Sequence, residues 1–282
     1  MPHPPKTWFI TGASSGFGHA FAVHAIERGF NVVATARNVS ALQILVAQAP
    51  DRVLALPLDV TQPAHPGAAV DQALERFGRI DVLINNAGYA AVGALEETPE
   101  DELRALMETN FFGSIRVIQA ILPTLRAQRS GAIVNISSSA GQFSFAGFSA
   151  YSASKFAIEG ASEALAQEMA PFGVKVLIVE PGGFRTELNG AGMREMPILD
   201  AYKHIVDPSR SMVEVGHGKQ PGDPRKAASV IELALDAKRT PLHLPLGADS
   251  IFAIRAHAES LLVEMAQWEG IAAATNFTDI TS

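Results

Sequence analysis

The sequence predicts a single α/β domain with a doubly wound, seven-stranded parallel sheet and a C-terminal helical extension. Short apolar runs rich in β-branched residues alternate with longer amphipathic stretches up to about residue 246, which is typical of repeated βαβ units. The apolar runs are nearly continuous, as in strands buried on both faces. A length of 282 residues, 48% of them hydrophobic, suits one large domain better than two.

The alternation defines the expected elements of this Rossmann-type domain. The strands are expected over residues 7–11, 32–36, 53–58, 82–85, 132–137, 175–180 and 242–246. Helices are expected over residues 17–28, 40–48, 67–77, 100–127, 150–170 and 224–237. Gly29, Gly78 and Gly173 stand where these helices should end, because glycine adopts the left-handed conformation that closes a helix.

Residues 184–223 interrupt the alternation with eight glycines and prolines among mixed apolar and charged residues. Loops of this length in compact domains usually cover a ligand site, so we expect a mobile substrate-loop insertion. Residues 1–247 are then expected to form the dinucleotide-binding and catalytic domain. Residues 248–282 would extend it, with an amphipathic helix over 248–270.

Composition narrows the class of protein. A net charge of −7 with no basic run argues against a nucleic-acid partner. The chain has no cysteine, and its eight histidines are dispersed without ligand spacing, so we expect surface or helix histidines and no metal site. Six residues precede the first apolar run, and no apolar stretch approaches the length of a membrane span. We therefore expect a cytoplasmic protein without a membrane partner.

A glycine-rich turn follows the first expected strand. It reads Thr11-Gly12-Ala13-Ser14-Ser15-Gly16-Phe17-Gly18 and leads directly into a helix. Backbone N–H groups at a helix N-terminus bind anions, and glycine lets a pyrophosphate approach closely. A structural turn is the alternative, but the strand before it and the helix after it favour a dinucleotide site.

The second strand ends at Arg37 and offers no carboxylate for an adenosine ribose. A guanidinium can instead hold the 2′-phosphate of NADP, so we expect NADPH to be preferred over NADH. A solvated surface arginine is the alternative. Asp59 and Val60 follow the third strand, and residues 85–88, Asn-Asn-Ala-Gly, follow the fourth. Both stand where strand ends should line the crevice, although either could be an ordinary turn.

Tyr151 and Lys155 are four residues apart in a predicted helix, so both side chains lie on one face. A nearby ammonium favours the phenolate and should bring the tyrosine pKa down from about 10 toward neutral pH. Ser138 lies thirteen residues before Tyr151, at the carboxyl end of the fifth strand, where open α/β sheets bind ligands.

Taken together and in this order, the glycine turn, residues 85–88, Ser138 and Tyr151-x-x-x-Lys155 resemble the short-chain dehydrogenase/reductase family. The resemblance covers about residues 6–246. It implies an oxidoreductase that transfers a hydride between a nicotinamide and a carbonyl or alcohol. Tyr151 would be the acid/base, Ser138 would bind the substrate oxygen, and Lys155 would hold the nicotinamide ribose and lower the tyrosine pKa.

Two further implied sites complete the set. Asn110 matches the asparagine that kinks its helix and binds a water leading protons to the lysine, and the segment Pro181-Gly182-x-x-x-Thr186 matches the one that meets the nicotinamide amide and the diphosphate. The expected cofactor contacts are Gly12, Ser14, Ser15, Gly16, Phe17, Gly18, Arg37, Asp59, Val60, Asn86, Ala87, Gly88, Tyr151, Lys155, Pro181, Gly182, Phe184 and Thr186.

The substrate is expected to be a small molecule that is bulky and largely apolar, because aromatic and methionine side chains surround the predicted chemistry. These are Phe143, Phe145, Phe148, Phe184, Met193, Met196, Ile198, Leu199, Tyr202 and Met212. An acidic group on the substrate is the alternative, because residues 184–223 also carry arginines and lysines. The resemblance also implies a homodimer through the helices over 100–127 and 150–170. A non-catalytic NADP(H)-sensing regulator on the same fold is the alternative function, and an isomerase, epimerase or dehydratase is a third.

Overall fold

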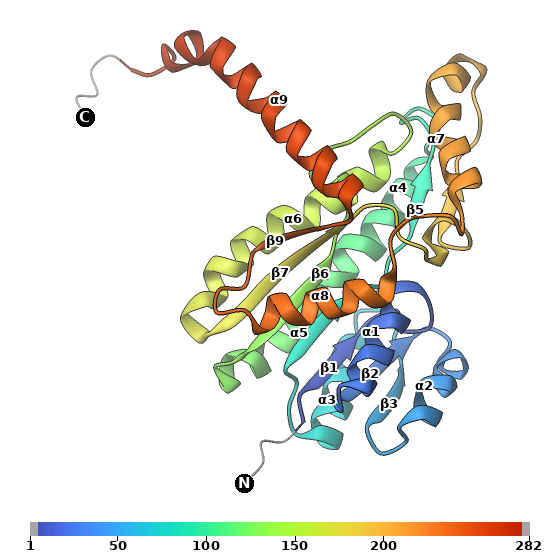
Figure 1. Cartoon of the computed structure of the whole chain (residues 1–282), viewed down its shortest axis with the longest axis vertical. Coiled ribbons are helices and arrows are strands. Elements are labelled where there is room, and N and C mark those ends of the chain that lie inside the picture. The colour runs from blue at the N-terminus through green and yellow to red at the C-terminus, as the bar shows by residue number, and fades with distance from the viewer. Residues whose placement is uncertain (1–4, 278–282) are drawn as a thin grey trace.

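A computed structural model describes residues 5–277 and shows the predicted sheet (Figure 1). Its seven strands are all parallel and run in the order β3-β2-β1-β4-β6-β7-β9. In that order they are β3 (Val53–Pro57), β2 (Asn31–Ala36), β1 (Thr7–Ile10), β4 (Val82–Asn85), β6 (Gly131–Ile136), β7 (Val174–Pro181) and β9 (His243–Leu246). Each bound lies within one residue of its prediction, and the doubly wound class is confirmed.

Helices cover both faces of the sheet. Their bounds are α1 (Gly16–Glu27), α2 (Gln43–Gln48), α3 (His65–Phe77), α4 (Glu100–Met107), α5 (Gly113–Gln128), α6 (Ser149–Met169), α7 (Lys203–Gly216), α8 (Pro224–Asp236) and α9 (Ala248–Ala273). Apolar residues of α1, α2 and α8 pack on one face, and those of α3, α5 and α6 pack on the other. In β1, Trp8 and Ile10 enter the first layer while Phe9 enters the second, because successive strand residues point to opposite faces.

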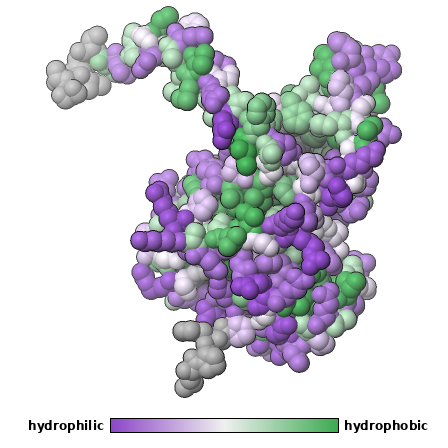
Figure 2. Space-filling view, in the orientation of Figure 1, coloured by the Kyte–Doolittle hydropathy of each residue, from purple (hydrophilic) through white to green (hydrophobic). Residues whose placement is uncertain are grey.

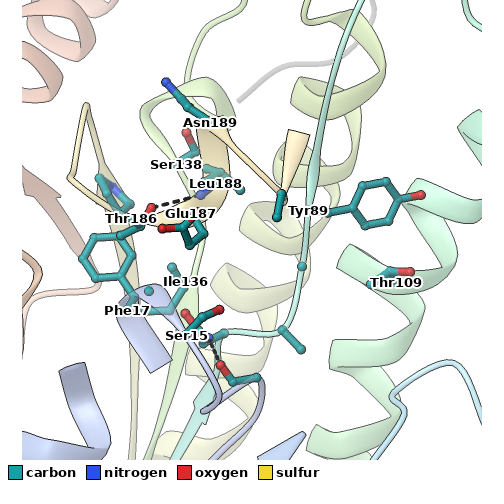
Figure 3. A pocket seen from close by; sticks show the side chains of 18 of the residues that line it. Ser15, Phe17, Tyr89, Thr109, Ile136, Ser138, Thr186, Glu187, Leu188 and Asn189 are labelled. Atoms are coloured by element: carbon teal, nitrogen blue, oxygen red, sulfur yellow. Dashed lines mark hydrogen bonds between the residues drawn. The ribbon is translucent and has the colours of Figure 1, made fainter. Parts of the chain in front are cut away.

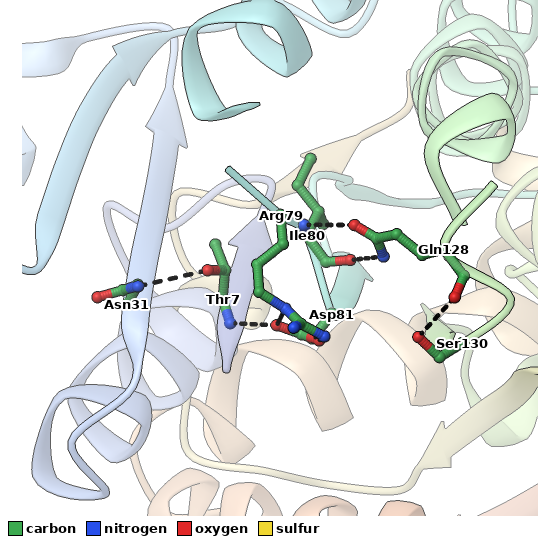
Figure 4. A network of polar contacts seen from close by, with 7 residues as sticks. All are labelled: Thr7, Asn31, Arg79, Ile80, Asp81, Gln128 and Ser130. Atoms are coloured by element: carbon green, nitrogen blue, oxygen red, sulfur yellow. Dashed lines mark hydrogen bonds and ion pairs between the residues drawn. The ribbon is translucent and has the colours of Figure 1, made fainter. Parts of the chain in front are cut away.

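The amino ends of the strands are joined by a polar network (Figure 4). Asp81, just before β4, accepts a hydrogen bond from the backbone N–H of Thr7 at 2.8 Å and from the Arg79 guanidinium at 2.5 Å. Gln128, at the end of α5, exchanges two hydrogen bonds with the backbone of Ile80, at 2.7 and 3.2 Å. These contacts satisfy backbone groups at the edge opposite the predicted site, so that edge has a structural role.

The predicted helix over 100–127 is interrupted. A π-helical turn, η2 (Glu108–Phe112), separates α4 from α5. π-Turns inside helices are frequent at functional sites. Two short parallel strands that the sequence did not predict, β5 (Ala90–Val92) and β8 (Met193–Glu195), form a second sheet above the carboxyl edge.

The segment over 184–223 is more regular than its composition suggested. It contains β8, short helical turns and the helix α7, which includes Pro208. Val206 and Val213 of α7 are buried, which compensates for the proline in its interior. The expectation of an irregular insertion was therefore wrong for α7, because glycines and prolines at the ends of the segment obscured its helical period.

The C-terminal helix was predicted correctly, but its apolar side chains are not covered within the described chain. α9 projects from the body, and Ser250 is its one buried residue in residues 5–277 (Figure 1). Hydrophobic residues lie along the projecting helix (Figure 2). The exposed large ones are Ile251, Phe252, Leu261, Leu262, Val263, Met265, Trp268 and Ile271. Between residues 5 and 277, none of the helices combines the length and the apolarity needed to cross a membrane.

Candidate active site

The candidate site begins where the strand order reverses, between β1 and β4, since open α/β sheets bind ligands in the crevice at that point. The glycine turn joins β1 to α1 there. Gly12 and Gly16 have φ angles of +67° and +53°, a conformation that favours glycine. A Cβ on Gly18 would lie 2.3 Å from the carbonyl oxygen of Gly12. Glycine is therefore required at position 18 for the helix to approach the turn.

Asn86, directly after β4, holds the glycine turn in place. Its Nδ2 donates to the carbonyl oxygens of Thr11 and Gly12 at 3.0 and 3.1 Å. The Thr11 hydroxyl in turn accepts from the backbone N–H groups of Asn86 and Ala87 at 2.9 and 3.0 Å. The Asn86 amide thus supports the turn, a structural role that the sequence did not predict beside the expected cofactor contact.

A cavity of about 550 Å³ lies over this edge of the sheet and brings most of the predicted residues together (Figure 3). The predicted residues that line it are Gly12, Ser14, Ser15, Gly16, Phe17, Arg37, Asp59, Val60, Asn86, Ala87, Gly88, Ser138, Tyr151, Lys155, Pro181, Gly182, Phe184 and Thr186. Gly18 and Asn110 are the two predicted residues outside the lining; both lie behind it. The long cavity and its glycine cradle fit an extended dinucleotide.

Arg37 and Asp59 mark the far end of the cavity. Arg37 is exposed, beyond the last residue of β2. Partial burial works to raise the pKa of Asp59, but hydrogen bonds from Thr61 and the charge of Arg37 bring this pKa below its ordinary value. The guanidinium and the carboxylate therefore face the same rim, and Thr61 holds the carboxylate at 2.7 Å.

Ser138, Tyr151 and Lys155 meet at the other end. Tyr151 and Lys155 come from the first turns of α6, and Ser138 follows β6. The Lys155 ammonium donates to the carbonyl oxygen of Ile136 at 2.9 Å and lies 5.7 Å from the centroid of the Tyr151 ring. The three side chains therefore share one wall of the cavity.

Burial governs the acidity of this group. It raises the pKa of Tyr151 to about 12, and a hydrogen bond with Ser138 offsets only part of that effect. Burial lowers the pKa of Lys155 to about 8, against an opposing effect of the charge on Glu159. Burial therefore raises the pKa of Tyr151 in this structure, and the expected lowering by Lys155 is not seen. A tyrosine with a pKa raised in this way carries its proton at neutral pH.

Asn110 lies within the π-turn η2, as its expected helix-kinking position implied. Its Nδ2 donates to the carbonyl of Tyr89 at 2.9 Å and to the Ser154 hydroxyl at 3.0 Å. Its Oδ1 accepts from the backbone N–H of Tyr89 at 3.1 Å. The side chain is buried and ties the helix α6 to the strand-end segment, while the Asn110 carbonyl accepts from Ser114.

Comparison with known proteins agrees with this geometry. A family model described as short chain dehydrogenase matches residues 6–196, about two thirds of the chain. The chain belongs to the short-chain dehydrogenase family. It is therefore an oxidoreductase.

Relatives of this short-chain dehydrogenase match over most of its length. Oxidoreductase BOA17 of Botryotinia fuckeliana is 39% identical over 96% of this chain and 99% of its own. A 3-ketodihydrosphingosine reductase of Bacteroides thetaiotaomicron is 46% identical over 64% of this chain and 65% of its own. The crystal structure of a short-chain dehydrogenase from Streptomyces avermitilis is 50% identical, with a TM-score of 0.92 over 98% of this chain and 100% of that one.

A fourth relative carries a nucleotide. The alcohol dehydrogenase of the archaeon Thermococcus sibiricus, solved in complex with 5-hydroxy-NADP, is 25% identical, with a TM-score of 0.70 over 86% of this chain and 94% of that one. Structural neighbours of this dehydrogenase therefore bind nicotinamide dinucleotides in the same fold.

The sequence missed a polar group on the substrate side. Tyr89 donates to Glu102 at 2.9 Å, and Glu102 also pairs with Arg194 at 2.5 Å. The Arg194 guanidinium lies 4.6 Å from the Tyr89 ring centroid. Tyr89 and Arg194 line the cavity. The residues come from three separated segments, so no local spacing could have revealed the group.

The base of α9 supports the wall of the cavity without lining it. The Asp249 carboxylate accepts from the backbone N–H of Gly183 at 2.7 Å, and a Cβ on Gly182 would lie 2.4 Å from that carboxylate. Asp249 therefore positions the loop after β7. An acidic residue two positions after Gly247 gave no recognisable signal in the sequence.

Most of the apolar residues expected around the substrate do not line the cavity. Phe184 does, whereas Phe148 and Met196 are buried in a separate cluster beside Tyr151. Phe143 packs against His257 of α9. Three more of the expected residues are exposed and lie outside the lining; they are Ile198, Leu199 and Met212. The expected apolar lining was therefore largely wrong, because some of these side chains pack against other elements and others are exposed outside the cavity.

The basic residues of the segment are also engaged. Arg210 is buried and pairs with Glu97 at 2.7 Å, and Arg185 donates to the carbonyl of Gln220. Lys203 pairs with Asp200 at 2.7 Å. These pairs remove the main argument for an acidic group on the substrate.

Proposed function

We propose that this short-chain dehydrogenase reduces a carbonyl group, and oxidises the corresponding alcohol in reverse, with NADPH preferred over NADH. The observation that carries the proposal is the shared cavity. It brings Ser138, Tyr151 and Lys155 to one end and the glycine cradle to the other. The cradle has no Cβ at Gly12, Gly16 or Gly18, which suits a bound pyrophosphate.

The proposed chemistry assigns one role to each side chain. When bound, the dinucleotide supplies the hydride that adds to the carbonyl carbon. Ser138 donates a hydrogen bond to the carbonyl oxygen and orients it. Tyr151 gives its proton to that oxygen as the negative charge develops. Lys155, as an ammonium, binds the ribose and favours the tyrosinate that remains, and Asn110 orders the helix behind them.

Replacing Tyr151 with phenylalanine tests the acid/base assignment. We expect Tyr151→Phe to lower kcat about a hundredfold or more, because the ring still packs but the transferable proton is lost. NADPH affinity, measured by fluorescence titration, should stay within about twofold, since the cradle is unchanged. Comparable turnover of both proteins at neutral pH would exclude Tyr151 as the proton donor.

Arg37 tests the choice of cofactor. We expect NADPH to bind more tightly than NADH, and Arg37→Ala to weaken NADPH about tenfold to a hundredfold by removing a charge-assisted phosphate contact. NADH affinity should change little. Arg225→Ala is a matched control, because Arg225 is exposed and pairs with Glu27 outside the cavity. Equal affinities for both cofactors in the native enzyme would contradict the proposal.

We further propose that the substrate is a bulky, largely apolar carbonyl compound. Support comes from Leu188 and Phe184 in the lining, and from the relative in Bacteroides thetaiotaomicron, which is named as a 3-ketodihydrosphingosine reductase. We expect kcat/KM to rise along a series of ketones of increasing chain length and to be lowest for pyruvate-like acids. Higher efficiency with small acids would contradict the substrate assignment and leave the reaction class intact.

We also propose a homodimer in which residues up to 247 form the dinucleotide-binding and catalytic domain and those from 248 onward its extension; residues 1–4 and 278–282 lie outside the described residues. Phe112 and Phe156, on η2 and α6, are each 46% exposed, and Leu262 of α9 is 64% exposed. We expect light scattering to give about twice the 29.9 kDa chain mass. Phe156→Glu tests an interface through α6, and Leu262→Glu tests one through α9. The variant that places a charge in the interface should give monomers. A monomeric native enzyme would contradict the dimer.

A further inference from the structure

A buried cluster of polar side chains lies directly behind Lys155. Glu159, on α6, is 4% exposed, and Glu180, at the end of β7, is 1% exposed. Gln142 donates to both carboxylates, at 3.1 and 2.9 Å. The His243 Nδ1 lies 2.7 Å from the Glu180 carboxylate and 3.5 Å from that of Glu159. The expectation of surface or helix histidines was wrong for His243, which joins this cluster from β9.

The donors of the cluster do not satisfy every oxygen of the two buried carboxylates. One oxygen of Glu159 and one of Glu180 have no hydrogen-bond partner in the described residues. Burial raises the pKa of Glu159 to about 7, and burial also raises the pKa of Glu180. Carboxylates this close relieve their repulsion by sharing a proton. The short contacts of Gln142 and His243 already occupy the centre, so a proton fits the cluster better than a metal ion.

His243 links the cluster to solvent. Its side chain is 35% exposed, and its Nε2 lies 3.6 Å from the exposed Glu163 carboxylate. From α9, Asp249 is bound to the backbone of Gly183. The titratable groups around Lys155 and Glu159 are therefore Tyr151, Glu163, Glu180 and His243, with Asp249 beyond them. The imidazole of His243 lies between the buried pair and the exposed Glu163.

Glu159 stands one helical turn after Lys155, on the same face of α6. Its charge is the one opposing effect on the lysine pKa, which burial lowers. Lys155 otherwise makes its hydrogen bond to a neutral carbonyl, that of Ile136. The carboxylate therefore supplies the negative charge that a buried ammonium needs.

We propose that Glu159 is a positioning residue that acts through Lys155, and that Glu180, Gln142 and His243 form with it a proton-sharing carboxylate pair that keeps the lysine charged. The inference rests on the proposed function, in which Lys155 works as an ammonium. It assigns no contact between Glu159 and the substrate. Its effect is on the pH range over which the enzyme works.

The direction in which the pH profile should shift follows from the charges of Lys155 and Glu159. The ammonium of Lys155 is lost as pH rises through its pKa, which gives the basic limb of the pH profile of kcat/KM. Glu159→Gln removes the opposing charge, so the lysine pKa should fall further and the limb should move to lower pH by about one unit. Glu180→Gln removes a like charge beside Glu159, so Glu159 ionises more readily and the limb should stay or move to higher pH.

The experiment measures pH profiles of the native enzyme, Glu159→Gln, Glu180→Gln and the control Glu168→Gln. Glu168 is exposed on the same helix, so its variant carries the same charge change and should leave the limb unmoved. In protein labelled with ¹³C-lysine and free of substrate, the Cε resonance of Lys155, assigned with Lys155→Arg, should titrate at a correspondingly lower pH in Glu159→Gln. Thermal melting shows that each variant is folded.

A limb and a lysine titration that do not move in folded Glu159→Gln would overturn the inference. A shift of both Gln variants to lower pH would assign the cluster a merely structural role and would also overturn it. If Glu159→Gln does not fold, the pH profile of Glu180→Gln is the test, because a basic limb at lower pH in that variant would contradict the inference. An inactive native enzyme would overturn the proposed function, and the lysine titration would then decide this inference alone.

Discussion

The hydrogen bonds from the Asn86 amide to the carbonyls of Thr11 and Gly12 are the interaction on which the site depends. They join the end of β4 to the glycine turn at the point where the strand order reverses. The turn can receive this amide only because Gly18 lacks a Cβ, which would lie 2.6 Å from Nδ2. The cradle and the start of α1 are therefore held to the end of β4 by this one side chain.

At the other end of the cavity, burial sets the acidity of the side chains. Tyr151, Lys155 and Glu159 lie along the first half of α6, and removal from water changes the acidity of each. Burial favours the neutral form of every group, so a phenol keeps its proton while a lysine tends to lose one. A family member that needs a charged lysine in such a place requires a compensating negative charge, and the fold brings Glu159 there from the same helix.

The segments that differ most from the strand-and-helix frame lie at the carboxyl edge. The π-turn η2 places Asn110 under Tyr89, and the β5–β8 pair carries Arg194 over the same region. Asp249, at the start of α9, fixes the loop after β7. These irregular elements shape the substrate side, whereas the regular sheet shapes the cofactor side.

The sequence by itself determined the sheet, the layers and the glycine turn, since apolar runs and glycine positions are local signals of buried strands and tight turns. It also placed Ser138, Tyr151 and Lys155, because Tyr151 and Lys155 share a helix face and Ser138 follows a strand end. Only the tertiary structure decided the contacts of Tyr89, Arg194, Asp249 and His243. It also decided that the Asn86 amide holds the glycine turn. These positions depend on contacts between segments far apart in the chain, which no local period encodes.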